Sequence, residues 1–447
     1  MTTESDEVPL FVPSDHRSDQ GKKEGHSPGD RRTRLLAYGV LAAAAFVLVA
    51  TYIPDQPTLS PYDEWVYVDY VDKMTRLDVP QQGELIDTYA LEIASCRGVF
   101  VWGTIGSPCG GPYESLAYPL EGVTSADIHP PMYFGATAGL AGAMRGVGLF
   151  DDLLTSARAV GALWLFLGLS AIFLLARDLG ASSQSAVGAS LLIASLPLVR
   201  LTNSYITPDA LNLAVGGAVL LAALRTSRGS WPWWSMALVG VFAGAVKTQN
   251  VLVVAAAAVF LLWAALRHRT RASGRRSALG VGAVSIGFLV PQIGWLAVRQ
   301  MASLSESPDT AAEGALTGEL MLREMTAFVF RLGLGDLQPV PVYAYLVTAV
   351  IIAGGLGAVL YRPVKDERWG MGTSVMLLVF VGSPILLLTQ YIAFGEVAAA
   401  PNRYGGSLLA GIGAMTATAF QSRRRGWLLC AFGIAALATV AVDNLAR

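Results

Sequence analysis

Residues 250–276 read NVLVVAAAAVFLLWAALRHRTRASGRR, an uncharged apolar run that ends in a cluster of basic residues. A helix needs about 20 apolar residues to cross the hydrocarbon core of a bilayer. Residues 250–266 are therefore predicted to form a transmembrane helix. Cytoplasmic loops of membrane proteins carry an excess of Lys and Arg, so the basic cluster predicts that this helix ends on the cytoplasmic side.

Apolar stretches of the same kind recur along the whole chain. Hydrophobic residues make up 53% of the 447 residues and charged residues only 15%, whereas a soluble domain carries about 25% charged residues. The chain is therefore predicted to be an all-α polytopic membrane protein with about 11 transmembrane helices. The other predicted spans are 35–53, 157–176, 184–201, 207–225, 233–247, 278–297, 342–360, 371–392, 404–420 and 426–442.

The apolar stretch 130–149 is ambiguous in hydropathy, and the charge of the loops resolves it. Arg31, Arg32 and Arg34 precede the first span and predict a cytoplasmic N-terminus. If residues 130–149 do not cross the bilayer, every later basic loop falls on the cytoplasmic side, and if they cross, all of these loops move outside. We therefore expect a helix on the outer membrane surface. The basic residues that decide this are Arg177, Arg225, Arg228, those of 267–276, Arg362, Lys365, Arg368 and those of 423–425.

This topology divides the chain into a tail and a membrane domain. Residues 1–34 begin with a polar segment rich in Pro, Gly and Ser and predict a disordered cytoplasmic tail, followed by an uncleaved first helix. The membrane domain, residues 35–447, contains two long extracytoplasmic loops, 54–156 and 298–341. The second loop is predicted to hold an amphipathic surface helix and a flexible linker.

Net charge and cysteine content exclude one class of partner and leave one question open. The formal net charge of −1 argues against a nucleic-acid partner, because proteins that bind nucleic acids carry a clustered basic excess. Cys96 and Cys109 share the first outer loop, where a disulfide between them and two free thiols are both compatible with the sequence. Together with Cys430 they show no metal-binding spacing.

Ionisable residues that are unusual in so apolar a chain gather at the predicted outer ends of the spans. Asp63 and Glu64 head the first outer loop, in the stretch PYDEWVYVDYVDKM at 61–74. Two adjacent carboxylates at a membrane surface can take a proton from a hydroxyl or bind a divalent cation. Lys247 and Arg403 could hold a phosphate by charge and by paired hydrogen bonds. Other polar residues predicted at the same level are His129, Arg158, Asp209, Gln249, Asn402 and Tyr404.

Several of these residues also have a purely structural interpretation. Asp209 could cap a helix N-terminus, and His129, which precedes two prolines, could simply mark a helix start. Arg403 could anchor the end of its helix. Lys247 is harder to explain in this way, because a charge inside an apolar hairpin is costly without a partner.

The helix expected after Asp63 also carries aromatic and charged residues that we interpret structurally. Its aromatic side chains are expected to be interfacial anchors, because Trp and Tyr collect at the membrane–water interface; they are Trp65, Tyr67 and Tyr70. The same helix is expected to turn a solvated face outward, formed by Asp69, Asp72 and Lys73.

The order of these segments resembles the GT-C superfamily of membrane glycosyltransferases, in particular the protein mannosyltransferase and lipid A aminoarabinose-transferase type. That superfamily has an acidic motif after the first span and a His-Pro-Pro-aromatic segment that opens a juxtamembrane helix. The lysine break here is followed by Gln249, where the family often differs. The matching segments, spread over about residues 35–410, are Asp63-Glu64, HPPMYF at 129–134, Arg158 in SARAVGALW, Thr207 to Ala210, Lys247-Thr248 and Arg403-Tyr404.

The resemblance implies a transferase of the cell (plasma) membrane that moves a sugar from a polyprenyl-phosphate donor to a glycan, lipid or protein acceptor on the outer face, with inversion. By this resemblance Asp63 would be the base, supported by Glu64, and Asp209 would be a second acid. Metal use varies within the superfamily, so Mg²⁺ or Mn²⁺ held by these three acids stays open. The donor phosphate would be held by Lys247, Arg403, Arg158 and Tyr404, and the substrate contacted by His129, Gln249 and Asn402.

Two other classes of function remain open. A lipid or glycolipid transporter or flippase would place ionisable residues near the bilayer midplane and break its helices in paired halves. A non-catalytic envelope-assembly protein would use the acidic loop only for contacts. The acids of this chain lie instead at one predicted end of the spans, which favours the transferase.

Overall fold

The computed structural model describes residues 28–53, 57–61, 63–268, 272–305, 314–334, 340–395, 397 and 401–445. Over these residues the chain is helical, and its only β pairing consists of three isolated bridges. The predicted all-α class is therefore confirmed. The α-helices are α1 (Pro28–Tyr52), α2 (Glu64–Thr75), α3 (Thr88–Arg97), α4 (Met132–Gly146), α5 (Leu153–Asp178), α6 (Ser183–Ala194), α7 (Pro197–Ser204), α8 (Asn212–Arg228), α9 (Ser235–Val246), α10 (Val251–Arg267), α11 (Ala272–Met301), α12 (Gly318–Arg331), α13 (Val342–Leu360), α14 (Glu367–Phe394), α15 (Leu409–Ala419) and α16 (Arg423–Leu445).

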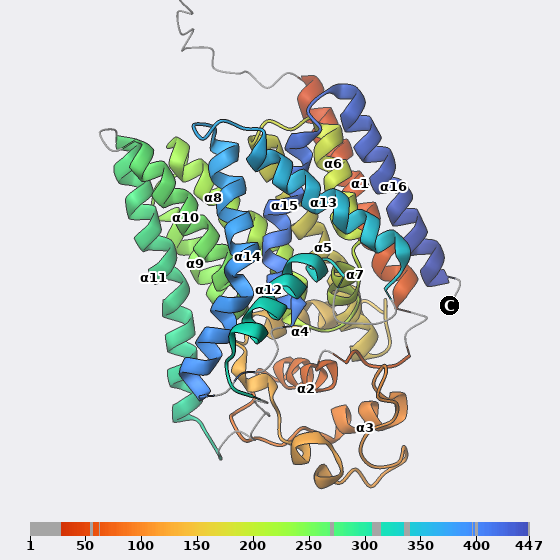
Figure 1. The fold of residues 1–447 in the computed structure, drawn as a ribbon. Helices are drawn as coiled ribbons and strands as arrows, with labels where there is room; N and C mark the ends of the chain where they lie inside the picture. The colour runs from red at the N-terminus through yellow and green to blue at the C-terminus, as the bar shows by residue number, and fades with distance from the viewer. Residues whose placement is uncertain are drawn as a thin grey trace, which may run out of the picture.

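The long helices run side by side as a bundle, and α2 and α3 lie beyond one end of it (Figure 1). We call this end the loop end. The short 3₁₀ helices η1 to η3 also belong to the first loop, and η4 to η6 precede α8, α10 and α15. Their bounds are η1 (Ser115–Ala117), η2 (Pro119–Gly122), η3 (Ala126–Ile128), η4 (Pro208–Leu211), η5 (Thr248–Asn250) and η6 (Asn402–Leu408).

Every predicted span coincides with a helix or helix pair, but the count of eleven is not confirmed. Within the described residues, eight helices are long and apolar enough to cross a membrane, and a ninth is possible if the bent pair α6 and α7 is one span. Two predicted spans correspond to shorter helices, α9 with 12 residues and α15 with 11. The predicted span 233–247 already ended at the break at Lys247, whereas the predicted span 404–420 also includes most of η6.

The stretch 130–149 forms the short helix α4, which has 15 residues and packs against α2 and α5. It starts at Met132, directly after two prolines, because proline has no amide hydrogen and is best tolerated in a first helical turn. The first loop therefore contains juxtamembrane helices, as expected. The second loop holds the predicted amphipathic helix as α12, while residues 306–313 and 335–339 lie outside the described residues.

The N-terminal boundary of the bundle differs from the expected one. Helix α1 begins at Pro28, so residues 28–34 of the predicted tail are helical. Residues 1–27, for which we expect disorder, lie outside the described residues.

The expectation of a solvated face on α2 was wrong. Asp69 and Lys73 are 0% and 1% exposed and form an ion pair at 3.0 Å. Lys73 also pairs with Glu84 at 2.7 Å and donates a hydrogen bond to the carbonyl of Leu85. The first loop folds back over the helix here and supplies partners that the sequence of α2 alone could not indicate.

The aromatic residues of α2 are not interfacial anchors either. Trp65, Tyr67 and Tyr70 are all less than 5% exposed. The ring of Tyr70 stacks on Phe134 of α4 with centroids 4.0 Å apart. These side chains therefore form the interface between α2 and α4, which fixes α2 against the bundle.

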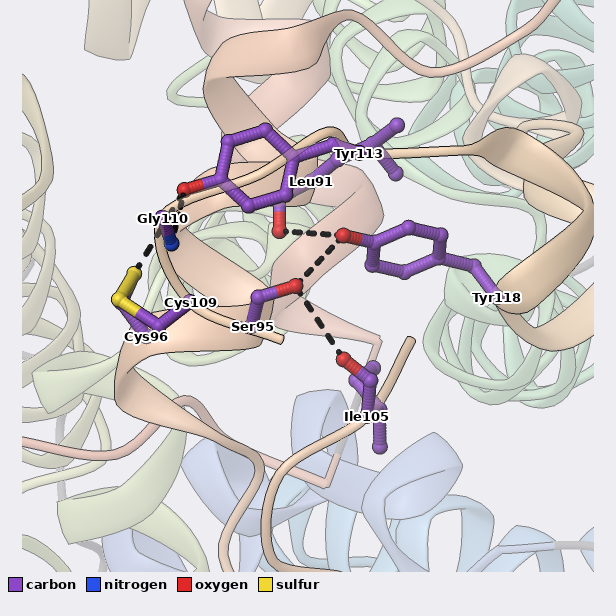
Figure 2. The surroundings of a disulfide bond; sticks show 8 residues. All are labelled: Leu91, Ser95, Cys96, Ile105, Cys109, Gly110, Tyr113 and Tyr118. Atoms are coloured by element: carbon purple, nitrogen blue, oxygen red, sulfur yellow. Dashed lines mark hydrogen bonds between the residues drawn. A yellow bond between two sulfur atoms is a disulfide. The ribbon is translucent and has the colours of Figure 1, made fainter. Parts of the chain in front are cut away.

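Cys96 and Cys109 form a disulfide, which decides between the two alternatives left open by the sequence. The bridge joins the end of α3 to the segment that follows it (Figure 2). Tyr118 supports the same region from the other side, because its hydroxyl lies between Ser95 and the carbonyl of Leu91. The loop is thus cross-linked as a disulfide-containing cap on the bundle, which is typical of an oxidising compartment.

Candidate active site

Asp63 lies at the turn into α2 with its carboxylate 42% exposed. Its backbone is left-handed, with φ of 63° and ψ of 20°. Asp is one of the few residues other than Gly that adopts this conformation readily, because its short polar side chain can bond locally. The turn directs the Asp63 carboxylate toward the bundle, where Oδ2 lies 3.1 Å from Nη2 of Arg403.

Glu64, the next residue, is turned into the protein. Its carboxylate receives two hydrogen bonds from Arg158 of α5, from Nε at 2.9 Å and from Nη2 at 2.8 Å. The backbone amides of Ser60 and Ile206 donate to the same carboxylate at 2.7 and 2.9 Å. Glu64 and Arg158 are 0% and 2% exposed, so this ion pair fastens the start of α2 to α5 inside the protein.

Asp209 is buried at the start of η4, where its carboxylate pairs with Lys247. Nζ of Lys247 lies 2.7 Å from Oδ1, and Asn212 donates to the same oxygen at 3.0 Å. The helix cap at this position is Thr207, whose hydroxyl accepts from the Asp209 amide. The carboxylate of Asp209 is thereby available for charge pairing. Lys247 itself reaches this position because the chain is extended between α9 and η5.

Arg403 joins the two acids. It lies in the first turn of η6, with Nη2 on Asp63 and with Nε 3.7 Å from Oδ2 of Asp209. Close packing holds η6 here, because a Cβ added at Gly216 of α8 would overlap the carbonyl oxygen of Ser407. Small residues are common where membrane helices approach this closely.

Four charged side chains therefore form a line: Asp63, Arg403, Asp209 and Lys247. Their formal charges cancel. Three are almost fully buried, and Asp63 alone among them is substantially exposed. The ring of Tyr404 lies beside both cations, 5.0 Å from Nζ of Lys247 and 5.8 Å from Cζ of Arg403. Access to the line is thus through Asp63.

Tyr67 and His129 border this line and contact each other. The Tyr67 hydroxyl is 3.2 Å from Nε2 of His129. Burial, and then the charge of Lys247, lowers the pKa of His129 to about 3, so its imidazole is neutral. Burial, together with the charge of Asp63, raises the pKa of Tyr67 well above its ordinary value. From the sequence, Tyr67 was interpreted only as an interfacial anchor, although its position four residues after Asp63 was a usable signal.

The structure brings together some of the predicted site residues and separates others. Asp63, Asp209, Lys247, Arg403 and Tyr404 form one cluster. Glu64 and Arg158 form a separate buried pair directly behind it. Asn402 is buried next to Arg403, and Gln249 is half-buried next to the lysine break.

The acids of the cluster do not offer a free set of metal ligands. Over the described residues, no group of three or more His, Cys, Asp and Glu side chains could hold a metal ion. Asp209 is already neutralised by Lys247 and Arg403, and Asp63 shares the same arginine. Because divalent cations need several unpaired oxygen ligands, the donor set does not fit Mg²⁺ or Mn²⁺.

One family model matches part of this chain. Residues 129–295 match the model of the dolichyl-phosphate-mannose-protein mannosyltransferase family. No curated protein sequence matches the chain at a comparable level of significance.

Two groups of solved structures are similar. ArnT from Cupriavidus metallidurans, bound to undecaprenyl phosphate, aligns with a TM-score of 0.52 at 16% identity, over 91% of this chain and 63% of that one. The oligosaccharyltransferase of Archaeoglobus fulgidus in its apo form aligns with a TM-score of 0.48 at 13% identity, over 92% of this chain and 56% of that one.

The chain thus spans less than two thirds of the length of the ArnT structure, and at this identity the likeness concerns the fold. That fold, the apolar helices and the mannosyltransferase match agree with one another. The chain is a multi-pass membrane protein whose fold is similar to that of ArnT and whose residues 129–295 match the mannosyltransferase family.

Proposed function

We propose that this protein transfers a sugar from a polyprenyl-phosphate donor to a cell-envelope acceptor on the extracytoplasmic face of the plasma membrane, with inversion at the anomeric carbon. The observation that carries the proposal is the position of Arg403 between an exposed carboxylate, Asp63, and a buried one, Asp209. A base and an anion-binding cation are thereby held side by side. The polyprenyl class of the donor is supported by the similarity of the fold to ArnT, whose structure contains undecaprenyl phosphate.

In the proposed reaction Asp63 acts as the general base. Its carboxylate takes the proton of the acceptor hydroxyl, and the freed oxygen forms a bond to the anomeric carbon. The bond between that carbon and the phosphate oxygen breaks, and its electron pair leaves with the polyprenyl phosphate. Attack opposite to the leaving group inverts the anomeric configuration. No second proton donor is needed, because phosphate is a good leaving group.

Arg403 and Lys247 neutralise the phosphate in this proposal. Arg403 carries a planar guanidinium that can bind two phosphate oxygens at once. Before the donor arrives, the same guanidinium binds Asp63, so an incoming phosphate would compete for it and release the carboxylate to act as base. The Asp209 carboxylate lies between the two cations and pairs with both, and the ring of Tyr404 packs beside them.

The remaining predicted residues receive supporting roles. Glu64 and Arg158 are proposed as positioning residues, because their ion pair fixes the backbone that presents Asp63. The neutral His129, together with Gln249 and Asn402, is proposed to contact the sugar or the acceptor. Because the carboxylates are already paired with cations, we propose no step that passes through a metal ion.

The proposal is tested by Asp63→Asn in the full chain, purified with lipid and supplied with a labelled polyprenyl-phosphate sugar. Loss of a general base lowers a rate by roughly 10²- to 10⁴-fold, and we expect this loss with unchanged abundance and thermal stability. Asp72→Asn is a matched control on α2, since Asp72 pairs with Arg76 and not with the cluster. Transfer retained in Asp63→Asn would reject Asp63 as the base.

The donor, the acceptor and the reaction class are tested in cells. Mass spectrometry should compare envelope glycans and polyprenyl-phosphate sugars with and without the gene. A transferase predicts that the donor accumulates and one glycan is lost. Movement of a lipid across the membrane by the wild-type protein without any sugar transfer would favour a flippase.

A further inference from the structure

A cleft of about 550 Å³ lies between the loop-end halves of α1 and α5, apart from the charged cluster. Its walls are apolar: Phe46 and Ala50 come from α1, Ile53 directly follows that helix, and Ala159 and Ala162 come from α5. Phe46 is 67% exposed, so the cleft opens on the outer surface of the bundle. Both helices are predicted to cross the membrane, which places this opening against lipid.

One cation closes the end of the cleft. Arg97, the last residue of α3, lines it together with Pro57. Its backbone is restrained because the neighbouring Cys96 is bridged to Cys109. Within the described part of the chain, no carboxylate forms an ion pair with Arg97, and its side chain is exposed. Thr155 adds a hydroxyl to the same lining.

The turn that follows Arg97 carries exposed apolar side chains. Val101 and Trp102 are 72% and 54% exposed at the tip of a turn closed by mutual hydrogen bonds between Val99 and Gly103. The turn is also tied to the segment beside the cleft, because the amide of Phe100 donates to the carbonyl of Leu59. Exposed Trp beside a basic residue is typical of the lipid headgroup level.

We infer that this cleft binds an anionic glycerophospholipid, with an acyl chain between α1 and α5 and the phosphate at Arg97. The volume lies within the range of roughly 300–1,000 Å³ found for ligand sites. The apolar walls match an acyl chain, and Arg97, which forms no ion pair with the described residues, matches the phosphate of an anionic lipid. This site is distinct from the proposed donor site, because the buried ion pair of Arg158 and Glu64 separates them. On the cleft side, Arg158 donates a hydrogen bond to the carbonyl of Thr58, next to the lining residue Pro57. On the other side, Glu64 is followed back along the chain by Asp63.

Native mass spectrometry of the full chain in detergent tests the inference. The protein is titrated with an equimolar mixture of phosphatidylglycerol and phosphatidylcholine that have identical acyl chains. One basic residue near a membrane surface gives a preference of about fivefold for an anionic lipid. We expect that preference in the wild type and its loss in Arg97→Gln. Arg331→Gln, which removes an arginine of α12 outside the cleft, should keep it.

A second variant tests the apolar part of the cleft. Ala159→Phe should fill the cleft and reduce the binding of both lipids. If this variant fails to fold, Arg97→Gln still tests whether the cleft prefers an anionic headgroup. The inference is overturned if the wild type shows no preference, or if Arg97→Gln keeps it. It is also overturned if polyprenyl phosphate displaces the phospholipid and Arg97→Gln abolishes transfer, because the cleft would then be the donor path. Because binding is measured without transfer, its failure is distinguishable from failure of the proposed function.

Discussion

Glu64 and Arg158 form a bidentate ion pair with N–O distances of 2.8 and 2.9 Å, and both side chains are almost completely buried. The pair joins the first turn of α2 to α5, and Glu64 directly follows Asp63. Two more hydrogen bonds, from the amides of Ser60 and Ile206, complete the environment of the carboxylate. The proposed base is therefore presented by a backbone segment that a buried polar network holds in place.

Removing one partner of this pair should destabilise the protein strongly. Glu64→Gln leaves Arg158 buried without its counter-charge, and breaking a buried pair in this way costs about 3–5 kcal/mol. The combined variant Glu64→Leu with Arg158→Met should recover part of the loss, because a packed apolar pair needs no counter-charge. Thermal unfolding of the purified variants measures both effects.

The matched control is the exposed pair of Asp72 and Arg76 on the same helix. Its removal should change stability by no more than about 1 kcal/mol, since exposed pairs contribute little. A Glu64→Gln variant as stable as this control would contradict the positioning role of the buried pair.

Arg403 should not be replaceable by lysine. Its Nη2 and Nε atoms reach Asp63 and Asp209 at the same time, and a single ammonium group cannot reproduce that geometry. Arg403→Lys is therefore expected to lower kcat/KM for the donor by roughly 10²-fold, the typical effect of losing one transition-state donor. Kinetics with a labelled donor measure this, and Arg76→Lys in the first loop serves as the control. Wild-type kinetics in Arg403→Lys would show that charge alone suffices.

Removal of divalent cations should leave transfer unchanged. Asp209 is neutralised by Lys247 and Arg403, and Asp63 shares that arginine, so no free carboxylate set is left for an ion. Transfer is measured with the purified protein before and after EDTA treatment. Activity that disappears with EDTA and returns with Mg²⁺ or Mn²⁺ would mean that the cluster rearranges around an ion.

The sequence predicted the members of the charged cluster because each is a charge at an unusual position. Lys247 interrupts an apolar hairpin, where a charge is costly without a partner, and Arg403 carries a positive charge on the predicted outer side, against the positive-inside trend. The helix class and the course of the chain followed from the same contrast between apolar runs and basic loops. These signals are local and therefore visible in one sequence.

The pairing of the charges was not predictable in the same way. Asp63 and Glu64 are adjacent, yet they point to different partners because Asp63 is left-handed and Glu64 is the first helical residue. The burial of Asp69 and Lys73 depends on a loop that returns from residues 84–87. Both outcomes depend on contacts with segments that are far away in the sequence, which a local pattern does not reveal.

His129 should make stability sensitive to acid. Burial lowers its pKa to about 3, below the ordinary value of 6.5, so the unfolded chain binds a proton that the folded protein rejects. The contribution of His129 to the free energy of unfolding is constant above pH 6.5 and falls as the pH drops from 6.5 toward 3, by about 1.4 kcal/mol per pH unit.

His129→Gln should remove this part of the acid sensitivity, which is measured by comparing thermal unfolding at pH 7 and pH 5. The wild type should lose about 2 kcal/mol more than the variant over that interval. Equal losses in wild type and His129→Gln would mean that His129 is solvated or paired with a carboxylate, and the neutral contact with Tyr67 would have to be abandoned.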